Sequence, residues 1–358
     1  MNANWKRVST IALLLLAAAL VFVQFRSFGK MSDRITALNN GQPIDWKHDF
    51  LAVFAHSPVH LLIALGLIYL GYIGRAIRWK IFLSKIRDVP VRALISPQFI
   101  GFSGLVLLGR PGEFIRPYLI SRRTGVGLST QMAILVVERI FDMGAFALIV
   151  ATNIVLSRSL QSLPFYSKFR TGSFVLLGGV LCFAFCCAML YRSGARVVGW
   201  LKGTGTSQSR VSLANKVESF SQGLHVLHGA DEILAGGAVS VATWLLIAGC
   251  YLFTVHSFGS PELQNMNFQR VLLLMFFSVA GGVIQLPGVG GGAQVVTIWA
   301  LNKVFGVPIG IAALGGILLW LITSVSVLLP GLLLARSEHV SLTAVSRVSE
   351  QEAAAEAL

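Results

Sequence analysis

Long uninterrupted apolar runs separate the polar segments of this chain. Each run lacks Asp, Glu, Lys and Arg over 18 residues or more, and a helix of about 20 residues is enough to cross a bilayer. The strands of a membrane barrel alternate apolar and polar positions, which these runs do not. The pattern therefore predicts an all-α polytopic membrane protein. The runs cover residues 8–25, 50–74, 171–191, 233–261, 271–302 and 304–335.

The composition agrees with this prediction. Of 358 residues, 55% are hydrophobic and 12% are charged, whereas soluble domains carry about 25% charged residues. The formal net charge of +14 would suggest nucleic-acid binding in a soluble protein. In a membrane protein, basic residues mark cytoplasmic loops and contact anionic lipids. We therefore expect a multi-pass protein of the cell (plasma or inner) membrane, with no nucleic-acid partner.

The basic residues also indicate how the helices are oriented. Lys and Arg concentrate in residues 75–92, 110–123 and 192–232, and the positive-inside rule places such segments in the cytoplasm. All three can be cytoplasmic only if residues 93–109 do not cross the membrane. That stretch is short for a span, and Pro97, Gly101 and Gly104 interrupt it. We therefore predict a re-entrant hairpin over residues 93–123 that enters and leaves from the cytoplasmic side.

A second stretch of the chain has the same organisation. The apolar run 270–285 ends in LPGVGGGAQ, which predicts another re-entrant hairpin over residues 270–305. Each hairpin follows a strong span, 50–74 in the first half and 233–257 in the second, and the charge distribution gives these spans opposite directions. The halves are therefore predicted to form an inverted repeat, as in many transporters. The alternative is that both Pro-Gly breaks are ordinary loop punctuation.

The resulting topology has about six full spans and two hairpins, or seven to eight transmembrane helices if hairpin arms are counted, with both termini cytoplasmic. At the N-terminus, Lys6 and Arg7 before an apolar run also fit a cleaved signal peptide. The run continues to Phe25 with no obvious cleavage site, which favours a retained anchor. The predicted segments are a signal-anchor helix and external loop at 1–49, a first repeat at 50–191, a cytoplasmic basic loop at 192–232, a second repeat at 233–335 and a polar tail at 336–358.

The stretch VVERIFD places three charged residues in the middle of the predicted span 124–157. Glu138 and Asp142 are four residues apart and share a helical face, and Arg139 can reach Asp142 around the helix. Each ionisable group at bilayer depth costs at least ~2.5–3.5 kcal/mol on insertion scales. Such groups are retained when they line a polar cavity or pair with one another, so both a functional cavity and a structural ion-pair lock remain open. In either case we expect an arginine beside the two carboxylates.

The stretch GRPGEFIR forms the predicted tip of the first hairpin. Pro111 disfavours helix at the residue before it, Gly112 allows a turn, and Glu113 begins a new helix whose N-terminus favours anions. Arg110 and Arg116 lie three residues on either side of Glu113. We therefore predict a cradle for one lipid phosphate, with guanidinium groups as ligands. The alternative is an interfacial loop that contacts lipid phosphates without specificity.

The second tip carries no charge. Its glycines permit unwound backbone and close helix approach, and it lacks the Gly-Lys-Ser/Thr ending of a phosphate loop. His225 and His228 are expected to be surface residues, because no third ligand accompanies them. We therefore expect neither a metal nor a cofactor. The second-tip residues are Pro287, Gly288, Gly290 and Gln294.

Three motifs in this order resemble those of the lysylphosphatidylglycerol synthase transmembrane (flippase-like) family: GRPGEFIRPYLI, then VVERIFD, then LPGVGGG. The basic segment GRAIRWKIFL fits as well, and the resemblance covers residues 50–335. It implies a membrane domain that moves aminoacylated or polyprenyl-linked lipids. Two features depart from the family: Gln294 stands where a Glu is common, and only a polar tail follows the last span. The matching positions are Arg110, Pro111, Gly112, Glu113, Arg116, Glu138, Arg139, Asp142, Pro287, Gly288 and Gly290.

These observations favour a transporter without chemistry of its own. The expected function is to move an anionic phospholipid or a polyprenyl-phosphate-linked lipid between leaflets. An integral-membrane transferase and a non-transporting partner protein in lipid or cell-envelope glycan biosynthesis are the alternatives. The expected partner is an anionic lipid substrate, and a homodimer or a complex with a cell-envelope enzyme also fits.

Overall fold

The computed structural model describes residues 46–164, 166–203, 229–282 and 291–338, and all regular structure in these ranges is helical. Short 3-10 (η1, η2) and π-helical (η3, η4) segments connect or interrupt the α-helices. In chain order the elements are α2 Trp46–His56, α3 Pro58–Leu83, α4 Val91–Leu108, η1 Arg110–Phe114, α5 Ile115–Thr124, α6 Leu128–Leu156, η2 Arg158–Leu160, α7 Tyr166–Gly203, α9 Ala230–His256, α10 Pro261–Gln264, α11 Phe268–Gly281, α12 Gly292–Trp299, η3 Ala300–Val304, α13 Ile309–Trp320, η4 Leu321–Val325 and α14 Leu328–Ser337.

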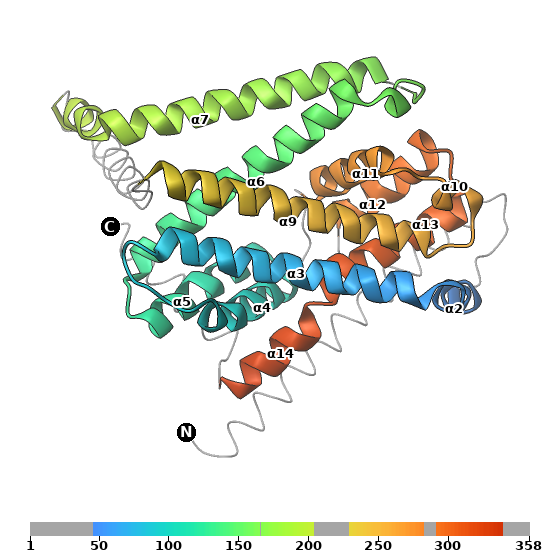
Figure 1. Ribbon diagram of the computed structural model, residues 1–358, viewed down its shortest axis with the longest axis horizontal. Helices are drawn as coiled ribbons and strands as arrows, with labels where there is room; N and C mark the ends of the chain where they lie inside the picture. Colours follow the sequence, from blue (N-terminus) through green and yellow to red (C-terminus); the bar gives the residue numbers. More distant parts are fainter. Residues whose placement is uncertain (1–45, 165, 204–228, 283–290, 339–358) are drawn as a thin grey trace.

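The helices run lengthwise through the molecule as an elongated bundle (Figure 1). Four helical stretches of the described chain are long and apolar enough to cross a membrane: α3, α4, α9 and the run from Ile309 to Ser337. Helix α6 is 29 residues long and α7 is 38. The predicted all-α polytopic membrane fold is therefore confirmed.

Helices α3 and α9 pack against each other along their length. A Cβ on Gly74 would lie 2.7 Å from the hydroxyl of Thr243. Farther along α3, the ring of Phe82 lies against Gly236, which comes earlier in α9. The two helices are therefore antiparallel, and their C-terminal ends lie at opposite ends of the bundle.

Helices α4 and α5 form the first hairpin. Arg123 near the end of α5 donates to the carbonyl of Ala93 near the start of α4, at 2.7 Å. At the tip, a Cβ on Gly112 would come within 2.2 Å of the carbonyl oxygen of Gly104, so only glycine fits there. Gly109 has a φ of 71° and turns the chain out of α4. Both outer ends of the hairpin therefore lie at the same end of the bundle, beside the end of α3.

Helices α11 and α12 form a second antiparallel pair. A Cβ on Gly281, the last residue of α11, would lie 2.5 Å from the carbonyl oxygen of Gly292, the first residue of α12. Farther out, the rings of Phe277 and Trp299 lie 5.6 Å apart. This pair follows α9 and so enters from the end of the bundle opposite to the α4–α5 hairpin (Figure 1).

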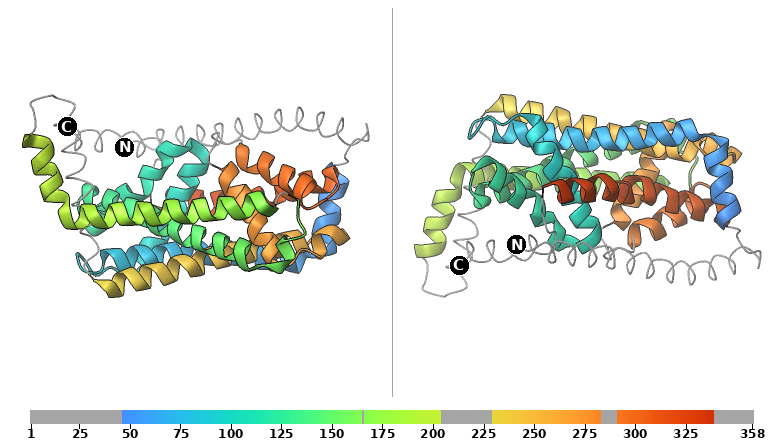
Figure 2. Two further views of the ribbon diagram at one scale, coloured as in Figure 1. Left: turned by 90° about the horizontal axis from the view of Figure 1, so that it is seen from above. Right: turned by 90° about the horizontal axis from the view of Figure 1, so that it is seen from below.

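The first strong span differs from its prediction. The run 50–74 was expected to be one span, but the chain breaks at Ser57, and the new helix has a proline at its start. Helix α2 lies across the start of α3 (Figure 2). Helix α3 then continues to Leu83, so Arg75 and Arg78 belong to the helix and not to a cytoplasmic loop. The helix continues beyond the apolar run because buried carboxylates of another helix bind these two arginines.

Other predicted segments are displaced or lie outside the described residues. Helix α7 continues to Gly203, so the loop expected at 192–232 begins later than predicted. The signal anchor, apart from the end of its predicted external loop, lies outside the described residues. The tip residues Pro287, Gly288 and Gly290, and nearly all of the polar tail, also lie outside them.

We expect cysteines at Ser121 and Ser162 to react from opposite sides of the membrane. Ser121 lies at the outer end of the α4–α5 hairpin, and Ser162 is exposed in the turn after α6, at the other end of the bundle. In vesicles of known sidedness, with the four natural cysteines replaced, an impermeant maleimide should modify Ser121→Cys only from the cytoplasmic face. Reaction of both cysteines from one face would contradict the hairpin topology.

Candidate functional site

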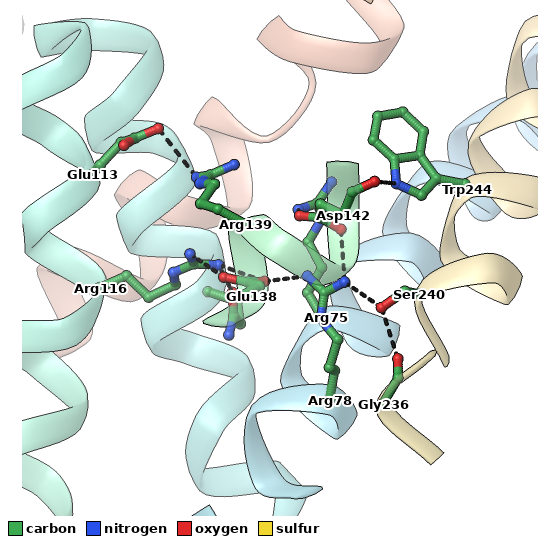
Figure 3. A network of polar contacts seen from close by, with 11 residues as sticks. Arg75, Arg78, Glu113, Arg116, Glu138, Arg139, Asp142, Gly236, Ser240 and Trp244 are labelled. Carbon is green, nitrogen blue, oxygen red and sulfur yellow. Dashed lines mark hydrogen bonds and ion pairs between the residues drawn. The ribbon is translucent and has the colours of Figure 1, made fainter. Parts of the chain in front are cut away.

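The carboxylates of α6 point into the bundle and not toward lipid. Glu138 is 1% exposed and Asp142 is 5% exposed. Their four-residue spacing places them on one face of α6, as the sequence predicts. Four helices, α3, α4, α5 and α9, supply the side chains that contact this face directly or through a shared arginine. The pair is the centre of a buried polar network (Figure 3).

Arg78 of α3 joins both carboxylates. Its Nη2 donates to Glu138 Oε1 at 2.5 Å, and its Nη1 donates to Asp142 Oδ1 at 2.6 Å. The same Nη1 also donates to the hydroxyl of Ser240 on α9, at 2.8 Å. Arg78 has no exposed surface. It therefore ties α3, α6 and α9 together in one set of charge-assisted hydrogen bonds.

Arg116 of α5 binds the other side of Glu138. Its Nη2 donates to Glu138 Oε2, and its Nη1 donates to the side-chain oxygen of Gln98 at 2.8 Å. The guanidinium carbon lies 4.6 Å from the centre of the Trp79 ring and 5.1 Å from that of Phe102. Such a planar cation is held both by its hydrogen bonds and by the faces of the aromatic rings. Glu138 therefore connects the first hairpin to α3 through two arginines.

Arg75 is the third arginine of the network. Its Nη1 donates to Asp142 Oδ2 at 3.1 Å, and its guanidinium carbon lies 5.0 Å from the centre of the Phe102 ring. Its side chain keeps 12% of its surface exposed. Unlike Arg78 and Arg116, it borders a cavity.

Glu113 and Arg139 form a separate ion pair at the edge of the network. Arg139 Nη2 donates to Glu113 Oε1 at 3.1 Å, and both side chains are about one-third exposed. The pair joins the tip of the first hairpin to α6. Arg139 therefore contacts Glu113 and not Asp142, which was the expected partner. Asp142 is bound by Arg75 and Arg78 instead (Figure 3).

The predicted phosphate cradle at GRPGEFIR has a different geometry from the expected one. Arg110 and Pro111 are exposed, whereas Arg116 is buried in its ion pair with Glu138. The two arginines therefore do not flank one open site. The new helix does not begin with free amide groups either, because the 3-10 turn η1 runs directly into α5 and the Ile115 amide donates to Gly112. A headgroup contact at Arg110 stays a prediction.

A cavity of about 250 Å³ lies between the inner ends of the two helical pairs. A neighbouring cavity of about 380 Å³ shares several of its walls, including Arg75. Arg75 is the one charged residue among the described residues that line either cavity. The polar residues lining one or both cavities are Tyr72, Tyr251, Ser278, Gln294, Thr297, Thr323 and Ser324.

Sequence reasoning missed Arg75 and Arg78 as partners of the carboxylates. Both were counted as charges of a cytoplasmic loop. Their spacing of three residues puts them on one helical face, as the spacing of four does for Glu138 and Asp142. The signal that could have identified them is that two apolar segments each carry a pair of charges on one helical face, and that the two pairs have opposite sign. The prediction that an arginine lies beside Glu138 agrees with the position of Arg116.

The chain matches one known protein family over the regions just described. Residues 5–331 match the family described as "Lysylphosphatidylglycerol synthase TM region". The chain belongs to this family. No curated protein and no solved structure matches it. Membership in the family associates the chain with membrane lipids, and its matched region includes α2 to η4, the buried network and both cavities.

We expect Arg78→Ala to lower the free energy of unfolding by about 3–5 kcal/mol, because it leaves two buried carboxylates without their shared partner. Lys80→Ala on the same helix is the control, since its pair with Asp88 is mostly exposed and should contribute at most about 1 kcal/mol. Thermal unfolding in detergent measures both. Equal losses in the two variants would show that Arg78 does not hold the network together.

Proposed function

We propose that this protein moves an anionic lipid, a phospholipid or a polyprenyl-phosphate-linked lipid, between the two leaflets of the membrane. The observation that carries the proposal is a cavity, bordered by Arg75 and several hydroxyl-bearing residues, between the inner ends of two helical pairs that enter the bundle from opposite ends. A headgroup crossing the bilayer needs such a polar path, because its charge is costly in hydrocarbon.

We infer that the two halves of the chain are an inverted repeat. Each half consists of a span, a helical pair and a long helix: α3, α4–α5 and α6 in the first, and α9, α11–α12 and the run from Ile309 to Ser337 in the second. The antiparallel packing of α3 and α9 supports this inference. Repeats of this kind place substrate sites near the midplane and alternate access between the two sides.

The cavity also suits a lipid headgroup in its chemistry. Arg75 supplies a cation, and the hydroxyl-bearing residues Tyr72, Tyr251 and Thr323 also line the cavity. A site that combines apolar walls with a few convergent polar groups is typical of ligand binding. This proposal involves no reaction catalysed by the protein itself. The cell membrane and cytoplasmic termini expected from the sequence are part of it.

A cavity-filling substitution tests the proposal without altering charge. Val279 lines both cavities, and its neighbour Ala280 is exposed. In proteoliposomes containing a labelled anionic phospholipid, we expect leaflet exchange by the natural protein. Val279→Trp should slow this exchange about tenfold or more, because the larger ring occupies the path of the headgroup and a barrier raised by about 1.4 kcal/mol slows a rate tenfold. Ala280→Trp should leave it unchanged.

Two outcomes would contradict the proposal. Equal rates in Val279→Trp and the natural protein would remove the cavity from the path. No exchange of any anionic phospholipid or polyprenyl phosphate by the natural protein would favour a non-transporting partner protein. Thermal unfolding of both variants serves as the folding control.

A further inference from the structure

We infer that the cavity binds one phosphodiester monoanion, with Arg75 and Gln294 as its anchors, and that it disfavours headgroups of net positive charge. The inference rests on the proposed function, because it names the class of headgroup that the transport site accepts. It follows from the charge balance of the buried network and from one hydrogen-bond donor left without a partner.

The network carries one more positive charge than its carboxylates neutralise. Three guanidinium groups, those of Arg75, Arg78 and Arg116, face the two carboxylates of Glu138 and Asp142. Arg139 and Glu113 neutralise one another and do not change the balance. Among the residues that the structure describes, the network and its ion pairs therefore hold one unbalanced positive charge.

That charge lies at Arg75. Arg78 and Arg116 are almost fully enclosed, and each donates to Glu138 from a buried position. Arg75 shares Asp142 with Arg78, whose bond to this carboxylate is the shorter one, 2.6 Å against 3.1 Å. Arg75 also borders both cavities. The unbalanced cation is thus the one that a ligand can reach.

Gln294 provides the second anchor. Its side chain is 6% exposed and lines the same cavity as Arg75. Its Nε2 has no hydrogen-bond partner within the described part of the chain. A buried donor without a partner costs free energy comparable to a lost hydrogen bond, and an anionic oxygen in the cavity would satisfy it. The adjoining segment, residues 283–290, contains no ionisable side chain, so it adds no charge of either sign.

An anion is therefore the ligand that would neutralise the excess charge of this site and satisfy the donor of Gln294. A buried network with one cation in excess of its carboxylates is costly, and a phosphodiester both neutralises the excess charge and accepts hydrogen bonds from a guanidinium and an amide. A headgroup that also carries an ammonium group gains less, because the described lining of the cavities contains no carboxylate to receive it. A headgroup of net positive charge would be repelled by Arg75. Inorganic phosphate has the same anionic chemistry and is the competing source of the ligand.

The test is a binding measurement on the purified full-length protein in nanodiscs of neutral lipid. Lipids with identical acyl chains and different headgroups are compared by native mass spectrometry: phosphatidylglycerol (net negative), phosphatidylcholine (neutral overall) and lysyl-phosphatidylglycerol (net positive). We expect phosphatidylglycerol to bind about tenfold or more tightly than phosphatidylcholine, because choline adds an ammonium group for which the described lining of the cavities has no carboxylate. Lysyl-phosphatidylglycerol should bind most weakly.

Variants then assign this preference to the two anchors. Arg75→Gln should abolish the preference for phosphatidylglycerol, whereas Arg75→Lys, which keeps the charge, should retain most of it. Gln294→Leu should weaken phosphatidylglycerol binding severalfold, because it removes the amide that donates to the phosphodiester. Arg92→Gln is the matched control, since it removes the same charge from an exposed position at the start of α4. Thermal unfolding of each variant identifies any that fails to fold, and Arg75→Lys and Gln294→Leu test the site independently of Arg75→Gln.

Several results would overturn the inference. These are an undiminished preference in folded Arg75→Gln, tighter binding of lysyl-phosphatidylglycerol than of phosphatidylglycerol, and inorganic phosphate that displaces the lipid at equal concentration. Failure of the transport proposal is distinguishable from these results. If the protein binds phosphatidylglycerol selectively but exchanges no lipid, the transport proposal fails and the binding inference stands. If it exchanges lipids without a headgroup preference, the binding inference fails and the transport proposal stands.

Discussion

The structure depends on the burial of Glu138 and Asp142 within a bundle of apolar helices. Carboxylates at this depth are tolerated only when cations meet them, and Arg78 meets both at 2.5 and 2.6 Å. The same requirement fixes how the helices pack, because the cations come from different elements. Arg78 connects α3 to α6, and Arg116 connects the first hairpin to α6. Apolar packing alone permits several arrangements of these helices, and the ion pairs select one of them.

This constraint explains why the first hairpin stays at its position. Helices α4 and α5 are held together at the tip by close glycine contact and at the base by Arg123, and Arg116 near the tip ties them to α6 and lies over the ring of Trp79. The second helical pair has no comparable ion pair among the described residues; it is held by aromatic and glycine contacts and by neutral hydrogen bonds such as that from Tyr251 to Ser278. One side of the cavity is therefore held by ion pairs, and the other by packing and neutral hydrogen bonds.

The excess cation connects the structural role of the network to the proposed function. A network with equal numbers of arginines and carboxylates would hold the helices together and attract nothing. The third arginine, Arg75, contributes a longer contact to Asp142 and borders the cavity. A charge retained at a cavity wall at a cost in stability is typical of binding sites. The lock and the cavity, which the sequence leaves as alternatives, coexist in one set of side chains.

The sequence by itself determined the features that depend on local pattern. The apolar runs set the helices, Pro-Gly breaks set the first hairpin near Gly112, and the four-residue spacing put Glu138 and Asp142 on one face. The tertiary structure alone decided which cations meet them, because Arg78 and Glu138 are 60 residues apart in the chain. Charge counting assigns arginines to loops, and only the partners supplied by other helices show that α3 continues through them. The cavity likewise arises where two helical pairs meet, which no local pattern records.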